Sequence, residues 1–107
     1  MIRFKFVRSG KKNIGFECTG HAGYAAAGND IVCAAVSSAV YLTANNITDF
    51  LNVKADVSVS EGFMSFMLTE ESALAQKMLD GLEAHIRAFA KDYPRNIKVI
   101  YGGNTNA

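Results

Sequence analysis

Between residues 20 and 38 the chain reads GHAGYAAAGNDIVCAAVSS, and this stretch joins the two kinds of element from which the fold is built. A strand pattern ends at Thr19 and an apolar helical pattern begins at Asn29 or Asp30, so we expect a loop between them. The helix carries Cys33 in its first turn. A helix N-terminus stabilises a thiolate through its unpaired N–H groups and partial positive charge. Cys33 is therefore a candidate nucleophile, and His21, across the loop, is its candidate base.

The residues before this stretch predict a β-hairpin. Apolar and polar residues alternate from Ile2 to Phe6 and again from Ile14 to Cys18, which is the period of half-buried strands. The segment 9–13, with sequence SGKKN, is rich in turn formers and separates the two arms.

The residues after it predict a second strand pair between two helices. The first helix is expected to run from Ile31 to about Phe50 and to be well buried, because it is apolar on most sides. Alternation from Val53 to Ser60 predicts a strand, and a turn at residues 61–62 leads into a second strand, Phe63 to Leu68.

A second helix and a last strand complete the chain. Thr69 is the predicted N-cap of the helix, and Pro94 ends it. Glu83 and Arg87 stand four residues apart on its expected solvent side, in the favourable order for an ion pair. Its expected buried face contains Leu74, Met78, Leu82, Ile86, Phe89 and Tyr93. Alternation from Ile97 to Tyr101 predicts the last strand.

The order ββαββαβ predicts a single α+β domain over residues 1–107. We expect a two-layer sandwich, with both helices on one face of a mainly antiparallel sheet. The opposite face would then carry apolar side chains, namely Val7, Phe63, Met67 and Ile100. Two explanations are open: a partner covers this face, most simply a second copy of the chain, or an end loop or the tail does.

Composition excludes several classes of partner. Eleven basic and ten acidic residues nearly cancel, so no strong field directs the chain to nucleic acid or to a membrane surface. An uncharged apolar run of ~20 residues is absent and basic residues interrupt the N-terminus, so we expect neither a spanning helix nor a secretory signal. Without such a signal, the two cysteines are expected to be reduced thiols of a cytoplasmic protein.

Each candidate residue of the central stretch also has a purely structural interpretation. A cysteine near a helix start is often a small buried hydrophobe, but the position of Cys33 in the first turn and the nearby His21 favour a nucleophile. Asp30 either caps the helix or orients His21, and capping is the better fit because the Cys33 N–H lies three residues on. Ser37, one helical turn beyond Cys33, either donates a hydrogen bond into the site or allows close helix packing.

The other potential metal ligands and cofactor motifs give no site. Cys18 belongs to the apolar side of a strand, and His85 lies at the edge of an amphipathic stripe, so both are expected to be packing residues. With Cys33 and His21 they show none of the paired spacings of zinc sites. Neither GxGxxG nor a phosphate loop ending in Gly-Lys-Ser/Thr is present. We therefore expect no metal ion and no cofactor.

In this stretch the sequence resembles the ribosomal-processing cysteine protease family, Prp. The family pattern is Gly-His-Ala, a short variable loop, and then Gly-x-Asp-Ile-Val-Cys-Ala-x-x-Ser. Here the pattern is matched by Gly20-His21-Ala22, by a loop over 23–27, and by residues 28–37, GNDIVCAAVS. Every fixed position agrees, and chain length and element order agree over the whole domain. The loop itself, GYAAA, is small and uncharged, and the resemblance leaves its contacts undetermined.

The resemblance implies a cytoplasmic endopeptidase, usually a homodimer, with a Cys–His dyad. Members remove an N-terminal extension from a large-subunit ribosomal protein, the twenty-seventh of that series, by cutting after a pair of Phe residues. Carried over, Cys33 is the nucleophile and His21 the base. A mobile substrate lid would comprise residues 22–28, including Ala22, Gly23, Tyr24 and Gly28.

Two hypotheses from different classes follow. The first is this endopeptidase, in which the N–H groups of Cys33 and Ala34 could contribute to an oxyanion hole because they point out of the helix end. The second is a non-catalytic dimeric adaptor that binds the ribosome or a ribosomal protein through the loop, with Cys33 merely buried. The ionisation of Cys33 distinguishes the two.

Overall fold

Helices and strands alternate in the computed structural model, which describes residues 1–20 and 31–103, in the predicted order ββαββαβ. The strands are β1 (Ile2–Ser9), β2 (Lys12–Thr19), β3 (Ala55–Ser60), β4 (Phe63–Leu68) and β5 (Ile97–Gly103). The helices are α1 (Ile31–Asn45), which continues into a π-helical turn η1 (Asn46–Phe50), and α2 (Ala73–Asp92).

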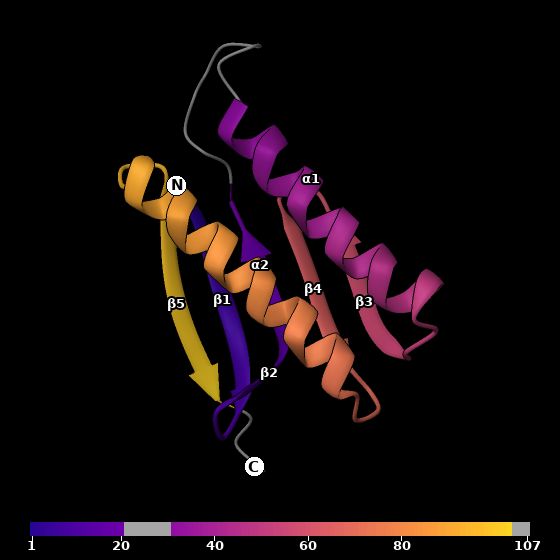
Figure 1. Ribbon diagram of the computed structural model, residues 1–107. Helices are drawn as coiled ribbons and strands as arrows, with labels where there is room; N and C mark the ends of the chain where they lie inside the picture. Colours follow the sequence, from indigo (N-terminus) through magenta and orange to yellow (C-terminus); the bar gives the residue numbers. More distant parts are fainter. Residues whose placement is uncertain (21–30, 104–107) are drawn as a thin grey trace.

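The strands form one sheet in the order β3-β4-β2-β1-β5. β1 pairs in parallel with β5, and the other three pairings are antiparallel. Figure 1 shows α1 and α2 side by side on one face of this sheet, with α1 over the β3–β4 side. The predicted two-layer α+β sandwich with a mainly antiparallel sheet is confirmed.

Aromatic side chains fill the space between the sheet and the helices. Phe4, Phe6, Phe16 and Phe66 are fully buried, and Phe16 stacks on Phe66 and on Phe4 with ring centroids 5.4 Å apart. From the helices, buried residues at intervals of three or four close the core, among them Val32, Val36, Val40, Leu79, Leu82 and Ile86. These intervals place the side chains on one helical face, which explains why both helices lie against the sheet.

The opposite sheet face carries the apolar residues that alternation predicts. Phe6 faces the helices, so the next residue, Val7, faces away, and register places Gly15 and then Met67 in the same row. Val7 is nevertheless only 5% exposed. The Met67 sulfur lies over Gly15, where an added Cβ would approach it to 2.9 Å. The glycine therefore provides room for a neighbouring apolar side chain on this face.

The start of α2 differs from the prediction. Ser72, not Thr69, is the N-cap, and its Oγ accepts a hydrogen bond from the Ala75 N–H at 3.1 Å. Because the helix begins after Ser72, Ala75 and Leu79 face the sheet, whereas Leu74 is 63% exposed. The assignment of Leu74 to the buried face was wrong.

Glu83 also lies on the other side of α2 from the one predicted. It is only 9% exposed and faces the sheet, where Arg8 Nη2 donates to Oε2 at 2.6 Å and Asn13 Nδ2 donates to Oε1 at 2.9 Å. The Tyr101 hydroxyl donates to Oε2 at 2.6 Å. Arg87 approaches the same carboxylate only to 3.9 Å. The partners that draw Glu83 inward come from three strands, which spacing along the helix does not reveal.

The length and composition of residues Ile31–Phe50 would allow them to cross a membrane, contrary to the expectation that no such segment is present. Only 28% of its most apolar window is buried in the fold, and Ile31, Leu42 and Phe50 are exposed, so the expectation that this helix is well buried was wrong. The buried members, Val32, Val36, Val40, Ala44 and Ile47, belong to the core under α1 and η1. Packing on the sheet therefore accounts for the apolar inner face of this segment.

Candidate active site

Cys33 is the third residue of α1, in the first helical turn, as the sequence predicts. Its side chain is half-buried and packs against the hydrophobic core. This position gives the thiol both partial exposure and the electrostatic influence of a helix N-terminus.

Gly20 fixes the end of β2. Its φ of +88° lies in the left-handed region that favours glycine, and an added Cβ would collide with the Met1 carbonyl oxygen. Its N–H donates to the Gly62 carbonyl oxygen at 2.8 Å, in the β3–β4 turn. The end of β2 is thereby held between the chain start and the β3–β4 hairpin.

Cys18 lies on β2 and faces the helices, because register pairs it with Phe4 and Met64. The pKa of Cys18 is raised from 9.0 to about 11, mainly by burial and to a smaller extent by the negative charge of Cys33. The two thiols are thus close enough to interact, and both are reduced. Cys18 is neutral at physiological pH and acts as an apolar packing residue, in agreement with its structural interpretation.

A pocket of about 140 Å³ opens beside this site, between α1 and the β3–β4 hairpin. Cys18 and Gly20 form its β2 wall. The remaining walls come from α1 through Val36, Ser37, Val40 and Tyr41, and from the hairpin through Val59, Ser60, Gly62, Phe63 and Met64. Most of these side chains are apolar.

The predicted site residues are only partly within the described structure. Ser37 is exposed, lies one turn beyond Cys33 and lines the pocket. His21, Asp30 and the predicted lid residues Ala22, Gly23, Tyr24 and Gly28 lie outside the described residues. Their roles remain predictions.

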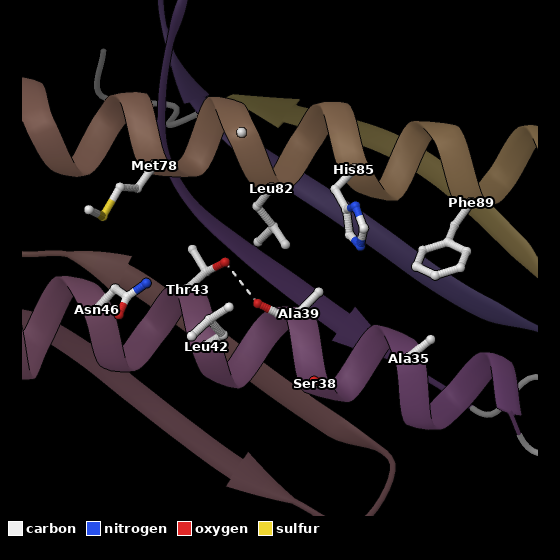
Figure 2. Close-up of a pocket in the computed structure, with 11 residues that line it drawn as sticks. Ala35, Ser38, Ala39, Leu42, Thr43, Asn46, Met78, Leu82, His85 and Phe89 are labelled. Atoms are coloured by element: carbon white, nitrogen blue, oxygen red, sulfur yellow. Dashed lines mark hydrogen bonds between the residues drawn. The ribbon is translucent and has the colours of Figure 1, made fainter.

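The second histidine lies in a different cavity. His85 lines a groove of about 600 Å³ between α1 and α2, together with Leu82 and Phe89 from its own helix. Figure 2 shows these side chains projecting from α2 toward Ala39 and Leu42 of α1. The His85 ring packs edge-on against Phe89, with centroids 5.0 Å apart. This contact agrees with the expectation that His85 is a packing residue.

The described residues contain no group of three or more His, Cys, Asp or Glu side chains that could hold a metal ion.

Sequence reasoning missed the contribution of the β3–β4 hairpin to the site. Val59 and Phe63 were assigned to strands, but nothing connected them with Cys33. The alternation of residues places Val59 on the same sheet face as Val57. This pattern indicates a contribution of Val59 to the site only when β3 is known to be the edge strand beside α1.

Comparison with known proteins identifies close relatives of this arrangement. The family described as cysteine protease Prp matches residues 1–98. The ribosomal processing cysteine protease Prp of Bacillus subtilis (strain 168) is 30% identical over 107 residues, which cover 92% of this chain and 96% of the relative.

Solved structures share the fold over nearly the whole chain. SMU.848 from Streptococcus mutans superposes with a TM-score of 0.85 at 25% identity, covering 97% of this chain and 96% of that one. The essential ribosomal processing protease Prp from Staphylococcus aureus, in complex with a covalently linked product peptide, gives a TM-score of 0.87 at 23% identity, covering 94% and 99%. A complex of the same protease with a substrate peptide gives 0.84 at 22%, with the same coverage.

Proposed function

The chain belongs to the cysteine protease Prp family and is a cysteine endopeptidase, and we propose that it removes the N-terminal extension of a ribosomal protein precursor. The proposed substrate is the twenty-seventh protein of the large-subunit series, cut after a pair of Phe residues. The observation that carries the proposal is the thiol of Cys33 in the first turn of α1, beside a small pocket of about 140 Å³. The Bacillus subtilis relative named for ribosomal processing supports the substrate class.

The proposed reaction uses a Cys33–His21 dyad. His21 takes the thiol proton, and the Cys33 thiolate attacks the carbonyl carbon of the scissile bond. The N–H groups of Cys33 and Ala34 stabilise the resulting oxyanion, since both belong to the first helical turn. His21 then donates its proton to the leaving amine as the C–N bond breaks, which leaves a thioester on Cys33. A water molecule, deprotonated by His21, hydrolyses the thioester, releases the carboxylate product and restores the thiol.

The neighbours of the dyad have proposed supporting roles. Asp30 caps α1 through the Cys33 N–H or orients His21, and Ser37 donates a hydrogen bond into the site. The lid over residues 22–28, with Tyr24 as its one large side chain, closes over the substrate. Asp30→Ala distinguishes the two roles of Asp30. A cap predicts a loss of about 0.5–2 kcal/mol in unfolding free energy with activity retained, and an orienting role predicts loss of activity without loss of stability.

The setting of the reaction is also part of the proposal. Two reduced thiols and a ribosomal substrate fit a cytoplasmic enzyme that requires no direct contact with nucleic acid or membrane. We propose that it acts as a homodimer. The sheet face opposite the helices, with half-buried Phe63, Met67 and Ile100, is a surface that a second copy could cover. Sedimentation equilibrium of the purified chain tests this, and a monomer at working concentration would contradict it.

The dyad is tested by incubating purified variants with the precursor and following the mass of the product. Cys33→Ala and His21→Ala should each abolish cleavage and leave the thermal midpoint nearly unchanged. His85→Ala is the matched histidine control and should cleave at the wild-type rate, because His85 packs in the interhelical groove. Full processing by Cys33→Ala would exclude the dyad and support a non-catalytic adaptor.

A further inference from the structure

Cys18 carries a second thiol, which the proposed reaction does not use. It is the last residue but one of β2, and its side chain faces the helices, because register pairs it with the buried Phe4 and Met64. β2 ends and α1 begins at the same end of the sheet (Figure 1). The second thiol therefore lies under the helix layer, at the end that carries Cys33.

Three observations place the two thiols close together. Both side chains pack against the same hydrophobic core. Cys18 shares a pocket with Val36 and Ser37, and Ser37 lies one helical turn, ~5 Å along the axis, from Cys33 on the same side of α1. The charge of Cys33 contributes to the raised pKa of Cys18, which requires a short distance between the two sulfur atoms. A disulfide needs Cα atoms ~4.4–6.8 Å apart, and the first turn of a helix can adjust to this distance because helix ends fray.

The surroundings of the two thiols give them different steps in a reaction with an oxidant. Cys33 is partly exposed at a helix N-terminus, a setting that favours a reactive thiolate. Burial keeps Cys18 protonated at neutral pH. Because a hydroperoxide reacts with the thiolate and not with the neutral thiol, it oxidises Cys33 first. A reactive, accessible cysteine with a second cysteine beside it is the usual arrangement of a redox-sensitive site.

We propose that Cys18 is a resolving thiol for Cys33 and that a hydroperoxide joins the two residues in a reversible disulfide. The Cys33 thiolate attacks the terminal oxygen of the peroxide, so that an S–O bond forms and the O–O bond breaks. Cys33 is oxidised to a sulfenic acid, and the leaving alkoxide takes up a proton and becomes an alcohol. The Cys18 sulfur then attacks the Cys33 sulfur and the S–O bond breaks. The Cys18 proton leaves with the hydroxyl group as water.

The disulfide changes the enzyme in two ways. Cys33 then has no thiolate with which to attack a peptide bond, so cleavage stops. Cys33 is also protected from further oxidation to the sulfinic and sulfonic acids, which thiol reductants do not reverse. In a reducing compartment such a disulfide is transient and regulatory. The effect on cleavage rests on the endopeptidase function proposed above, whereas formation of the disulfide does not.

Mass analysis of the oxidised protein tests the disulfide directly. The purified chain is treated with hydrogen peroxide, the remaining thiols are blocked, and a protease that cuts before Asp separates Cys18 from Cys33 at Asp30. The two peptides should stay joined without reductant and should separate in dithiothreitol. The same treatment in urea is the control for random pairing. Cys33 oxidised to the sulfinic acid while Cys18 stays reduced, or a disulfide that forms as fast in urea as in the folded protein, would overturn the proposal.

Recovery of activity distinguishes a resolving thiol from a packing residue. Excess hydrogen peroxide should remove most of the wild-type cleavage of the precursor, and dithiothreitol should restore most of it. Cys18→Ala and Cys18→Ser, each compared with its own untreated rate, should recover far less, because Cys33 proceeds to the sulfinic acid. Thermal midpoints show that the variants are folded.

Equal recovery by the wild type and a folded Cys18 variant would overturn the resolving role. Failure of the untreated wild type to cleave the precursor would instead overturn the proposed function, and the mass analysis would still decide whether the disulfide forms.

Discussion

The two cysteines of this chain should differ strongly in their reaction with iodoacetamide. Only the thiolate reacts, and the pKa of Cys18 is raised to about 11 by burial and by the charge of Cys33. At about pH 7.5, Cys18 is then ~0.03% ionised, whereas an ordinary free thiol of pKa ~8.5 is ~10% ionised. Ionisation alone should therefore make Cys18 react roughly 300-fold more slowly than a free cysteine.

Cys33 should react at least as fast as a free cysteine, because it is partly exposed in the first turn of α1. The assay is brief alkylation at several pH values, followed by peptide mapping. The single-cysteine variants Cys18→Ala and Cys33→Ala give each rate separately. Labelling in urea is the control, since unfolding should bring the two rates close together. Equal native rates, or protection of Cys33 in the folded protein, would refute the assignment of Cys33 as the nucleophile.

Three further predictions concern stability. Burial alone would raise the pKa of Glu83, but hydrogen bonds from Tyr101, Asn13 and Arg8 and the Arg8 charge lower it. The carboxylate therefore contributes stability that is present above its unfolded pKa and lost as pH falls through the lower folded value. Glu83→Gln should lower the free energy of urea unfolding by about 1–3 kcal/mol at neutral pH and by much less in acid. Arg87→Gln, the control, should change it by less than about 1 kcal/mol. Equal losses of stability in the two variants would contradict the buried network. The raised pKa of Cys18 has the opposite effect on the pH dependence of stability. The unfolded chain loses the Cys18 proton first, so stability should fall as pH rises from 9.0 to about 11. Thermal melts of Cys18→Ala should show a smaller loss over that range. Gly15→Ala should destabilise the sheet, because its Cβ would meet the Phe66 carbonyl oxygen. Gly81→Ala has no atom within 4 Å of its added Cβ and should stabilise α2 by about 0.5–1 kcal/mol. Thermal midpoints of the two variants that shift in the same direction would contradict this.

The fold was predictable from the sequence wherever one local period determines the outcome. Alternation in β1 and β2 predicted both strands and the face of each side chain, including Val7 on the side away from the helices. The same reasoning placed Met67 and Ile100 on that face. A two-layer sandwich then followed from the order of the elements.

Prediction failed where distant residues decide between two local choices. Thr69 and Ser72 are both good N-caps, and the sequence alone did not show that α2 starts at Ala73. Glu83 and Arg87 form the predicted i,i+4 ion pair at 3.9 Å, but the carboxylate is drawn inward by shorter contacts from Arg8 and Asn13, about 70 residues earlier in the chain. Helical periodicity contains no information about such partners.

In the candidate site, too, the local features could be predicted from the sequence and the contacts between distant segments could not. The position of Cys33 in the first turn could be predicted, because the start of a helix is a local property. The pocket could not, since α1, β2 and the β3–β4 hairpin meet there only in the folded sheet. Its hairpin wall depends on β3 being the edge strand beyond β4.

The burial of Cys18 has a consequence for the chemistry of Cys33. Coulomb repulsion between two thiolates is mutual. An ionised Cys18 would therefore raise the pKa of Cys33 by as much as an ionised Cys33 raises the pKa of Cys18. Desolvation keeps Cys18 protonated up to about pH 11, far above the range in which a cysteine protease works. The second thiol therefore packs against the site as a neutral group, and the partial positive charge of the α1 N-terminus acts on Cys33 without a competing thiolate at Cys18.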